Sequence, residues 1–273
     1  MKRQTTTPAV PILDFSVLDG LAFAAERGRL DAERVPRLEA RGIGPLLELH
    51  HLAGTKLLPK PEAAPWIALG TLDSFALALN SPMLHRQWIC PHTRSRGFQR
   101  TLIPPGDTTA WTGFTLRVQQ AAAGAGFPRA IAAQLAATVG ELSSNIYEHS
   151  HAAETGVVAF QVHTGRFELV VCDLGIGVCD SLRSAGEYRH LTDDGEALRL
   201  ALSDGTSRFG TLSGRGHGFR PIFIGLANLN GALRFRSGDH GLLMDGRNPA
   251  LVSARIAQKP KIGGFFASIT CEL

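Results

Sequence analysis

The feature that most restricts the fold is a change of hydrophobic period near residue 150. Residues 128–150 carry apolar side chains at spacings of three and four, which predicts one long helix with Ile131, Leu135, Val139, Leu142 and Ile146 on one side. Pro128 suits its first turn, because a missing N–H costs nothing there. Two apolar runs of strand length follow, 157–163 and 167–173, and Thr164-Gly165-Arg166 reads as a hairpin turn between them. A long helix beside an antiparallel pair predicts an α+β fold.

The remaining segments of this half fit the same fold. Further helices are expected at 111–125 and 221–230, and further strands at 232–237, 241–245 and 265–273. Gly231 is placed to end the second of these helices. We therefore expect a two-layer α+β sandwich, in which helices pack on a mixed, mostly antiparallel sheet.

A break in composition near residues 101–110 divides the chain. Pro104-Pro105-Gly106 can continue neither a helix nor a central strand, so we place a domain boundary there, between 1–103 and 104–273. The first part is expected to be a smaller, mainly helical domain, with helical apolar spacing over 16–30 and 35–53 and a further apolar stretch over 66–80. It carries no catalytic motif, and we interpret its His50-His51 pair as ordinary side chains rather than phosphoacceptors or metal ligands.

Composition excludes several classes of protein. With 44% hydrophobic and 19% charged residues, the 273-residue chain does not have the composition of a disordered protein. The formal net charge is only +4 and no long basic run occurs, so nucleic acid is not indicated as a partner. We see no signal peptide and no membrane span, and expect a cytoplasmic protein without a membrane partner. The four cysteines are scattered without a CxxC pair, which argues against zinc and against a disulfide framework.

Glu141 and Asn145 form the first of three motifs that carry chemistry. They are four residues apart on the expected long helix and so share one face. Asn offers a neutral oxygen of the kind that Mg²⁺ binds, and a carboxylate beside it can orient or deprotonate a water molecule. The pair therefore suits a magnesium–phosphate site with a water nucleophile.

The second motif, Asp173-Leu-Gly175-Ile-Gly177, ends an apolar strand. Its aspartate can accept a hydrogen bond from an exocyclic amine, and its glycines allow backbone to approach a flat ring without a Cβ. The third motif, Gly214-Arg215-Gly216-His217-Gly218, precedes a helix opened by Pro221. Free N–H groups and the positive end of a helix dipole predict a phosphate cradle there, and the alternating glycines suit a lid. It is not a Rossmann fingerprint, because it lacks the GxGxxG spacing and a βαβ unit.

Together the three motifs resemble the boxes of the GHKL superfamily, which includes the gyrase, heat-shock chaperone, histidine kinase and MutL ATPases. ELSSNIYEHS resembles its N box, DLGIG its first glycine box and GRGHGF its lid box. The resemblance covers residues 110–273. The spacing from Asn145 to His149 is also similar to that of the anti-sigma serine kinases within this superfamily.

The resemblance implies ATP and Mg²⁺ as ligands and a role for each motif. Asn145 would bind the Mg²⁺ that bridges the phosphates, and Glu141 would be the catalytic base or water-positioning group, with Glu148 as the fallback. Asp173 would bind the adenine amine. The resemblance also implies close approach of the nucleotide to the glycine box, at Gly175 and Gly177. In the lid box it implies contact at Gly214, Arg215, Gly216, His217 and Gly218. Arg215 and Arg208 are candidates for phosphate contacts.

The chain departs from the family pattern at three points. Phe265 follows Gly264 where family members often carry a Thr that touches the adenine pocket, which leaves Ser268 and Thr270 as candidates for that contact. Phe219 stands in the lid where Leu is usual, a tolerable apolar exchange. No phosphoacceptor-His helix precedes the domain, which argues against a sensor histidine kinase.

We therefore expect a regulatory switch that binds Mg·ATP and hydrolyses it slowly, while the lid reports the nucleotide state to a protein partner. Two alternatives stay open. One is a serine/threonine protein kinase acting on a small antagonist-type protein, in which Glu141 activates the acceptor hydroxyl. The other is a module that binds nucleotide without turnover. The sequence does not decide whether the N-terminal half forms a homodimer or recognises a target.

Overall fold

The computed structural model describes residues 10–102, 106–184, 186–203, 231–245 and 254–273. The helices in these ranges are α1 (Phe15–Glu26), α2 (Ile43–Gly54), α3 (Asp73–Leu79), α4 (Thr108–Gly124), α5 (Arg129–His149), α6 (Gly177–Arg183) and α7 (Asp194–Ala201). The strands are β1 (Leu38–Glu39), β2 (Ile67–Ala68), β3 (Gln87–Ile89), β4 (Arg96–Arg100), β5 (Val157–His163), β6 (Arg166–Asp173), β7 (Ala232–Asp245) and β8 (Arg255–Glu272).

One six-stranded antiparallel sheet organises the molecule. Its strand order is β3-β4-β5-β6-β8-β7, and β1 and β2 form a separate parallel pair. The expected hairpin is confirmed: β5 and β6 pair from Val157 opposite Cys172 to His163 opposite Arg166. The expected long helix is α5, and the expected helix at 111–125 is α4. The α+β class with a mostly antiparallel sheet is thus correct. The expected two layers are wrong, because α1, α2 and α3 of the N-terminal half pack on the second face of the sheet and add a third layer.

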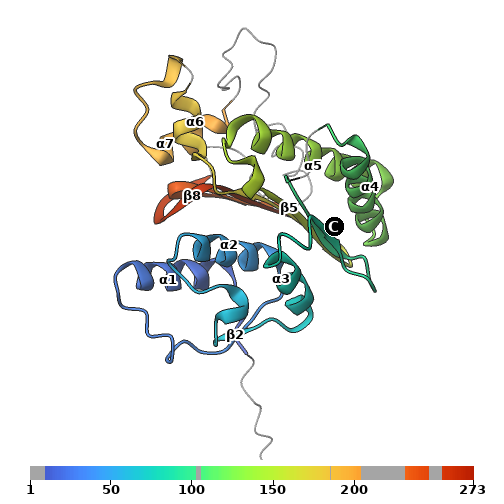
Figure 1. Ribbon diagram of the computed structural model, residues 1–273, viewed down its shortest axis with the longest axis horizontal. Coiled ribbons are helices and arrows are strands. Elements are labelled where there is room, and N and C mark those ends of the chain that lie inside the picture. Colours follow the sequence, from blue (N-terminus) through green and yellow to red (C-terminus); the bar gives the residue numbers. More distant parts are fainter. Residues whose placement is uncertain (1–9, 103–105, 185, 204–230, 246–253) are drawn as a thin grey trace, which may run out of the picture.

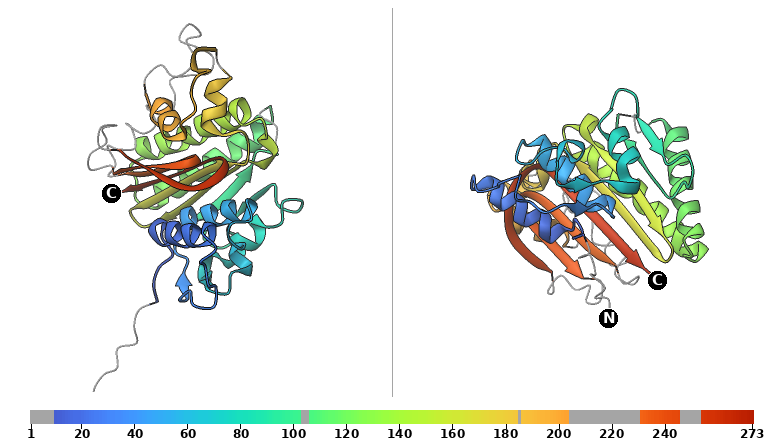
Figure 2. Two further views of the ribbon diagram at one scale, coloured as in Figure 1. Left: turned by 90° about the vertical axis from the view of Figure 1, so that its left-hand side faces the viewer. Right: turned by 90° about the horizontal axis from the view of Figure 1, so that it is seen from below.

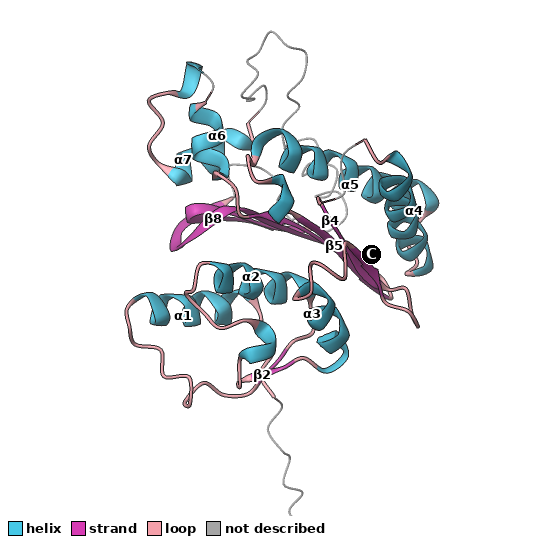
Figure 3. Ribbon diagram, viewed as in Figure 1, coloured by secondary structure: helices cyan, strands magenta, loops and turns pink. Residues whose placement is uncertain are grey.

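Helices cover both faces of this sheet (Figure 1). On one side lie α4 and α5, together with α6 and α7, and on the other lie α1, α2 and α3; the same layers are seen after rotation (Figure 2) and by type of element (Figure 3). We call the two sides the α5 face and the α2 face. Successive side chains of β6 point to opposite faces of the sheet. Leu169 and Val171 lie in the core beneath α5, and Val170 and Cys172 lie in the core beneath α2. The unbroken apolar runs of β5 and β6 reflect burial on both faces.

The N-terminal half contributes to the central sheet as well as to its cover. Strands β3 and β4 precede the boundary expected at 103/104, and β4 pairs with β5 from Arg96 opposite Gln161 to Arg100 opposite Val157. The expected helix at 35–53 begins only at Ile43, after β1. In the C-terminal half, the strands expected at 232–237 and 241–245 are one strand, β7, with an irregular register around Gly238. Gly238 has φ +59, so a bulge rather than a turn joins the two segments. The helix expected at 221–230 lies outside the described residues.

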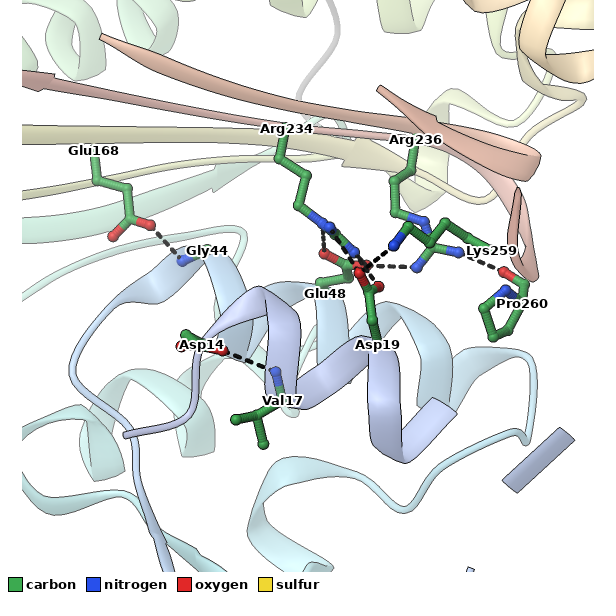
Figure 4. Close-up of polar contacts among 10 residues, drawn as sticks. All are labelled: Asp14, Val17, Asp19, Gly44, Glu48, Glu168, Arg234, Arg236, Lys259 and Pro260. Carbon is green, nitrogen blue, oxygen red and sulfur yellow. Dashed lines mark hydrogen bonds and ion pairs between the residues drawn. The ribbon is translucent and has the colours of Figure 1, made fainter. Parts of the chain in front are cut away.

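Buried charges fasten α1 and α2 to the sheet. Glu48 of α2 is fully buried and binds both Arg234 and Arg236 of β7 (Figure 4). Arg234 also binds Asp19 of α1, 2.5 Å from Nη2 to Oδ1, and Asp19 in turn binds Lys259 of β8. The guanidinium groups hold the pKa of the Glu48 carboxyl below its ordinary value, although burial alone would raise it.

The sheet also caps the N-terminus of α2. Its N-cap residue, Gly42, has no side chain to accept from the free N–H groups of the first turn. Glu168 of β6 supplies the acceptors instead: its carboxylate oxygens lie 3.0 Å from the Ile43 N and 2.9 Å from the Gly44 N (Figure 4 draws the bond to Gly44). A carboxylate at this position also suits the helix dipole. The α2 layer is therefore attached to the sheet at the first turn of α2 and again in the middle of the helix, at Glu48.

Candidate functional site

Asp173 is the last residue of β6 and lies on the α5 face of the sheet. It is 1% exposed. Its Oδ1 accepts a hydrogen bond from the Gly175 N–H at 2.7 Å, whereas its Oδ2 is enclosed with no hydrogen-bond partner among the described residues. Burial raises the pKa of this carboxyl to about 6, against the opposing effect of the Gly175 N–H, the Ser150 hydroxyl and the Phe265 N–H. One carboxyl oxygen is thus hydrogen-bonded, the other has no partner among the described residues, and the group has a pKa of about 6.

The loop after Asp173 is fixed by bonds from its backbone N–H groups. Leu174 N donates to Thr155 Oγ1, Ile176 N to the Ser150 carbonyl and Val178 N to Ser237 Oγ, each at 2.9 Å. These partners come from two separate segments of the chain, the connection between α5 and β5 and strand β7. The loop is therefore a rigid wall beside Asp173 rather than an open turn.

The two glycines of this motif are required by packing against the protein itself. A Cβ on Gly175 would collide with the backbone of Ser150. Gly177 has φ +78, and a Cβ there would lie 2.7 Å from Ser237 Oγ. These contacts account for both glycines without a ligand, so the ring contact inferred from the sequence stays a prediction.

Glu141 and Asn145 lie on α5, beside its apolar stripe. Glu141 is exposed and Asn145 is half-buried, while the neighbouring Leu142 and Ile146 are buried against the sheet. The end of α5 is joined to the Asp173 loop through Ser150, whose carbonyl accepts the Ile176 N–H. The structure thus brings the C-terminal half of α5 and the end of β6 to one region of the α5 face. It records no direct bond from Glu141 or Asn145 to Asp173.

The lid motif is outside the described residues. This applies to Gly214, Arg215, Gly216, His217 and Gly218, and to Arg208 and Phe219. Their expected contacts with phosphate stay predictions. Within the ranges that the structure covers, no group of three or more His, Cys, Asp and Glu side chains is arranged to hold a metal ion.

Ser268 and Thr270 are wrong as candidates for the contact with adenine. Alternation along β8 places Phe266 in the core of the α2 face, and Ala267 and Ile269 in the core of the α5 face. Ser268 and Thr270 share the parity of Phe266 and so point away from Asp173. Phe265 is the β8 side chain on the α5 face beside Asp173, with which it pairs in register.

Several residues that shape this region were missed by the sequence reasoning. Ser150, Thr155, Ser237 and Gly264 hold or enclose the Asp173 loop, and they come from three parts of the chain, the connection from α5 to β5, strand β7 and strand β8. Ser150 closes the ELSSNIYEHS segment, so its position next to Asn145 was the one available signal. Nothing in sequence spacing indicated the other three.

No family model, curated protein or solved structure matches this chain. No helix in the described part of the chain combines the length and the apolar character needed to cross a membrane. The function is therefore inferred from the chain's own residues.

Proposed function

We propose that this protein is a magnesium-dependent ATP-binding switch of the GHKL type, with slow ATP hydrolysis. The observation that carries the proposal is the enclosed Oδ2 of Asp173, for which the described part of the chain offers no hydrogen-bond donor within bonding geometry. Leaving a buried acceptor without a donor costs folding free energy, and a ligand that supplies the donor is one physical reason to keep such a group. The exocyclic amine of adenine is a donor of the right kind for this oxygen.

The other residues on the α5 face have roles that follow from their positions. Asn145, half-buried on α5, would supply one oxygen to a magnesium ion that neutralises phosphate charge, the remaining ligands being phosphate oxygens and water. Glu141, one helical turn away and exposed, would orient or deprotonate the attacking water. The loop of residues 174–178, fixed by its backbone hydrogen bonds, would hold the adenine in place while the phosphates are hydrolysed at the other end of the site.

The exposure of Glu141 favours a second candidate function. An acceptor hydroxyl of a protein partner can reach an exposed carboxylate on α5, and the protein would then be a serine/threonine kinase acting on a small antagonist-type protein. Incubation with γ-labelled ATP separates the candidates. Released phosphate indicates an ATPase, label on an added partner indicates a kinase, and binding without either indicates a nucleotide-binding module.

A base-specificity experiment tests the proposal directly. Calorimetry compares ATP with inosine triphosphate, which has a carbonyl acceptor where adenine has its amine. Wild-type protein should bind ATP at least tenfold more tightly, because the analogue places an acceptor against Asp173 Oδ2. Asp173→Asn replaces that oxygen with a donor and should reduce or reverse the preference. Equal affinity for the two nucleotides in the wild type, or no binding of either, would remove the adenine assignment.

A further inference from the structure

A two-glycine bulge inside β8, which we call the Gly263–Gly264 turn, joins the α2 layer to the Asp173 loop. On the α2 side, the Nε2 of His51, in the last turn of α2, lies 2.7 Å from the Gly263 carbonyl oxygen. His51 is buried and packs edge-on against Phe266, with ring centroids 6.4 Å apart. Burial lowers its pKa to about 4, so the imidazole is neutral near pH 7 and its Nε2–H donates to the carbonyl. The His51 side chain thus fixes the first glycine of the turn.

The second glycine of the turn contacts the candidate site. Gly264 has φ +62, and a Cβ there would collide with the backbone of Asp173 and lie 2.6 Å from Asp173 Oδ1. Its carbonyl accepts from Ser237 Oγ at 2.8 Å, and the same hydroxyl accepts the Val178 N–H at 2.9 Å. One turn therefore supports both the Asp173 carboxyl and the start of α6.

Helix α2, which carries His51, is held to the sheet by buried contacts. Glu48 lies one helical turn before His51 on α2 and is held between Arg234 and Arg236. The first turn of α2 is held by Glu168. A shift of α2 relative to the sheet would therefore have to break buried ion pairs before it moved the Gly263–Gly264 turn.

We infer that His51 is a positioning residue for the candidate site at Asp173: by holding Gly263 it sets the place of Gly264, and with it the geometry of the Asp173 carboxyl and of the α6 N-terminus. The identity of the ligand as ATP rests on the proposed function, whereas the mechanical link does not. It follows that the α2 layer, on the far side of the sheet, controls the affinity of the site for its base. Coupling of this kind is reciprocal, so a ligand at Asp173 also stabilises the bond from His51 to Gly263.

Four variants of the full chain test the inference. His51→Leu removes the donor at similar size, and His51→Asn has an amide too short to reach Gly263. His51→Gln restores a donor at nearly the reach of Nε2. His50→Leu is the matched control, because His50 is its neighbour on α2 and has no hydrogen bond to the turn among the described residues.

The first measurement needs no ligand. Amide hydrogen exchange at Gly175 and Val178 should quicken about tenfold in His51→Leu and His51→Asn, and stay as in the wild type in His51→Gln and His50→Leu. Both amides are bonded to groups next to the turn, so they report its position. Unchanged exchange in both donor-less variants, or equal acceleration in His51→Gln, would overturn the inference. If His51→Leu fails to fold, His51→Asn against His51→Gln decides.

The second measurement uses ATP. The donor-less variants should lose about fivefold to tenfold in affinity, the effect of one buried hydrogen bond, while phosphate release at saturating ATP stays unchanged because Glu141 is not involved. An equal fall in both quantities would indicate general damage and count against positioning. If the wild type binds no ATP, the proposed function fails, and the exchange data alone decide on the link from His51 to Asp173.

Discussion

Replacing Asp173 with Asn should stabilise the ligand-free protein at neutral pH. Asn has the same shape and keeps the acceptor for the Gly175 N–H, but it cannot ionise. Ionisation is the costly state here, because burial raises the carboxyl pKa from 3.8 to about 6. The variant removes that cost without opening a cavity.

The size of the effect follows from the pKa. Below pH 4 the carboxyl is protonated in both the folded and the unfolded chain, and its full contribution to stability is present. Between pH 4 and 6 the folded chain holds a proton that the unfolded chain has lost, so wild-type stability falls as pH rises through this window and levels off above it. A rise of about two pKa units at about 1.4 kcal/mol each gives about 3 kcal/mol. The unpartnered Asn amide offsets part of this, which leaves an expected gain of about 1–3 kcal/mol at pH 7–8.

Urea unfolding of both proteins at several pH values between 4 and 8 measures the difference. Glu168, whose pKa burial also raises, is present in both proteins, so its contribution cancels. The gain of the variant should be near zero at pH 4, grow to pH 6 and stay constant above. A difference independent of pH, or a variant less stable throughout, would show that ionisation of the buried Asp173 carboxyl does not destabilise the folded chain. Higher stability with lost ATP preference would mark Asp173 as a residue kept for function at the expense of stability.

Three further changes have defined outcomes. Asn145→Ala should weaken Mg·ATP much more than magnesium-free ATP in paired titrations, because one of few protein oxygens for the ion is lost; an equal fall in both would make Asn145 structural. Glu141→Ala should keep Mg·ATP binding but slow single-turnover γ-phosphate release or transfer about 10²–10⁴-fold, and wild-type rates with a loss in Glu148→Ala would move the role to the second carboxylate. Glu48→Ala should lower the free energy of unfolding by about 3–5 kcal/mol in urea, because Arg236 is left buried without its anion; a loss under 1 kcal/mol would contradict that account.

The parts of the fold that the sequence predicted are those set by local pattern. The period change near residue 150 located α5 and the β5–β6 hairpin, because each buries a continuous apolar face. Strand β4 could not be found in this way, since Arg96 and Arg100 occupy buried positions in it. Their charges are accommodated by distant carbonyls, among them Thr71 O for Arg96 and Leu79 O for Arg100, and no spacing rule indicates such partners.

The residues of the candidate site also divide into those that local sequence pattern predicts and those that it does not. Asp173 could be singled out because it ends an apolar strand and precedes two spaced glycines. The side of the sheet on which Ser268 lies could not be predicted, because it depends on how β8 pairs with β6, a strand nearly a hundred residues earlier in the chain. The bond from His51 to Gly263 spans 212 residues and leaves no trace in local composition.

The capping of α2 by Glu168 has a consequence for the order of folding. The acceptor for the Gly44 N–H lies 124 residues further along the chain, and the N-cap residue Gly42 offers no side-chain acceptor of its own. During synthesis at about 5–20 residues per second, roughly 6–25 seconds separate the two. Over that interval α2 has neither its cap nor the sheet on which it packs, so the first helices of the chain to be made are among the last to become stable.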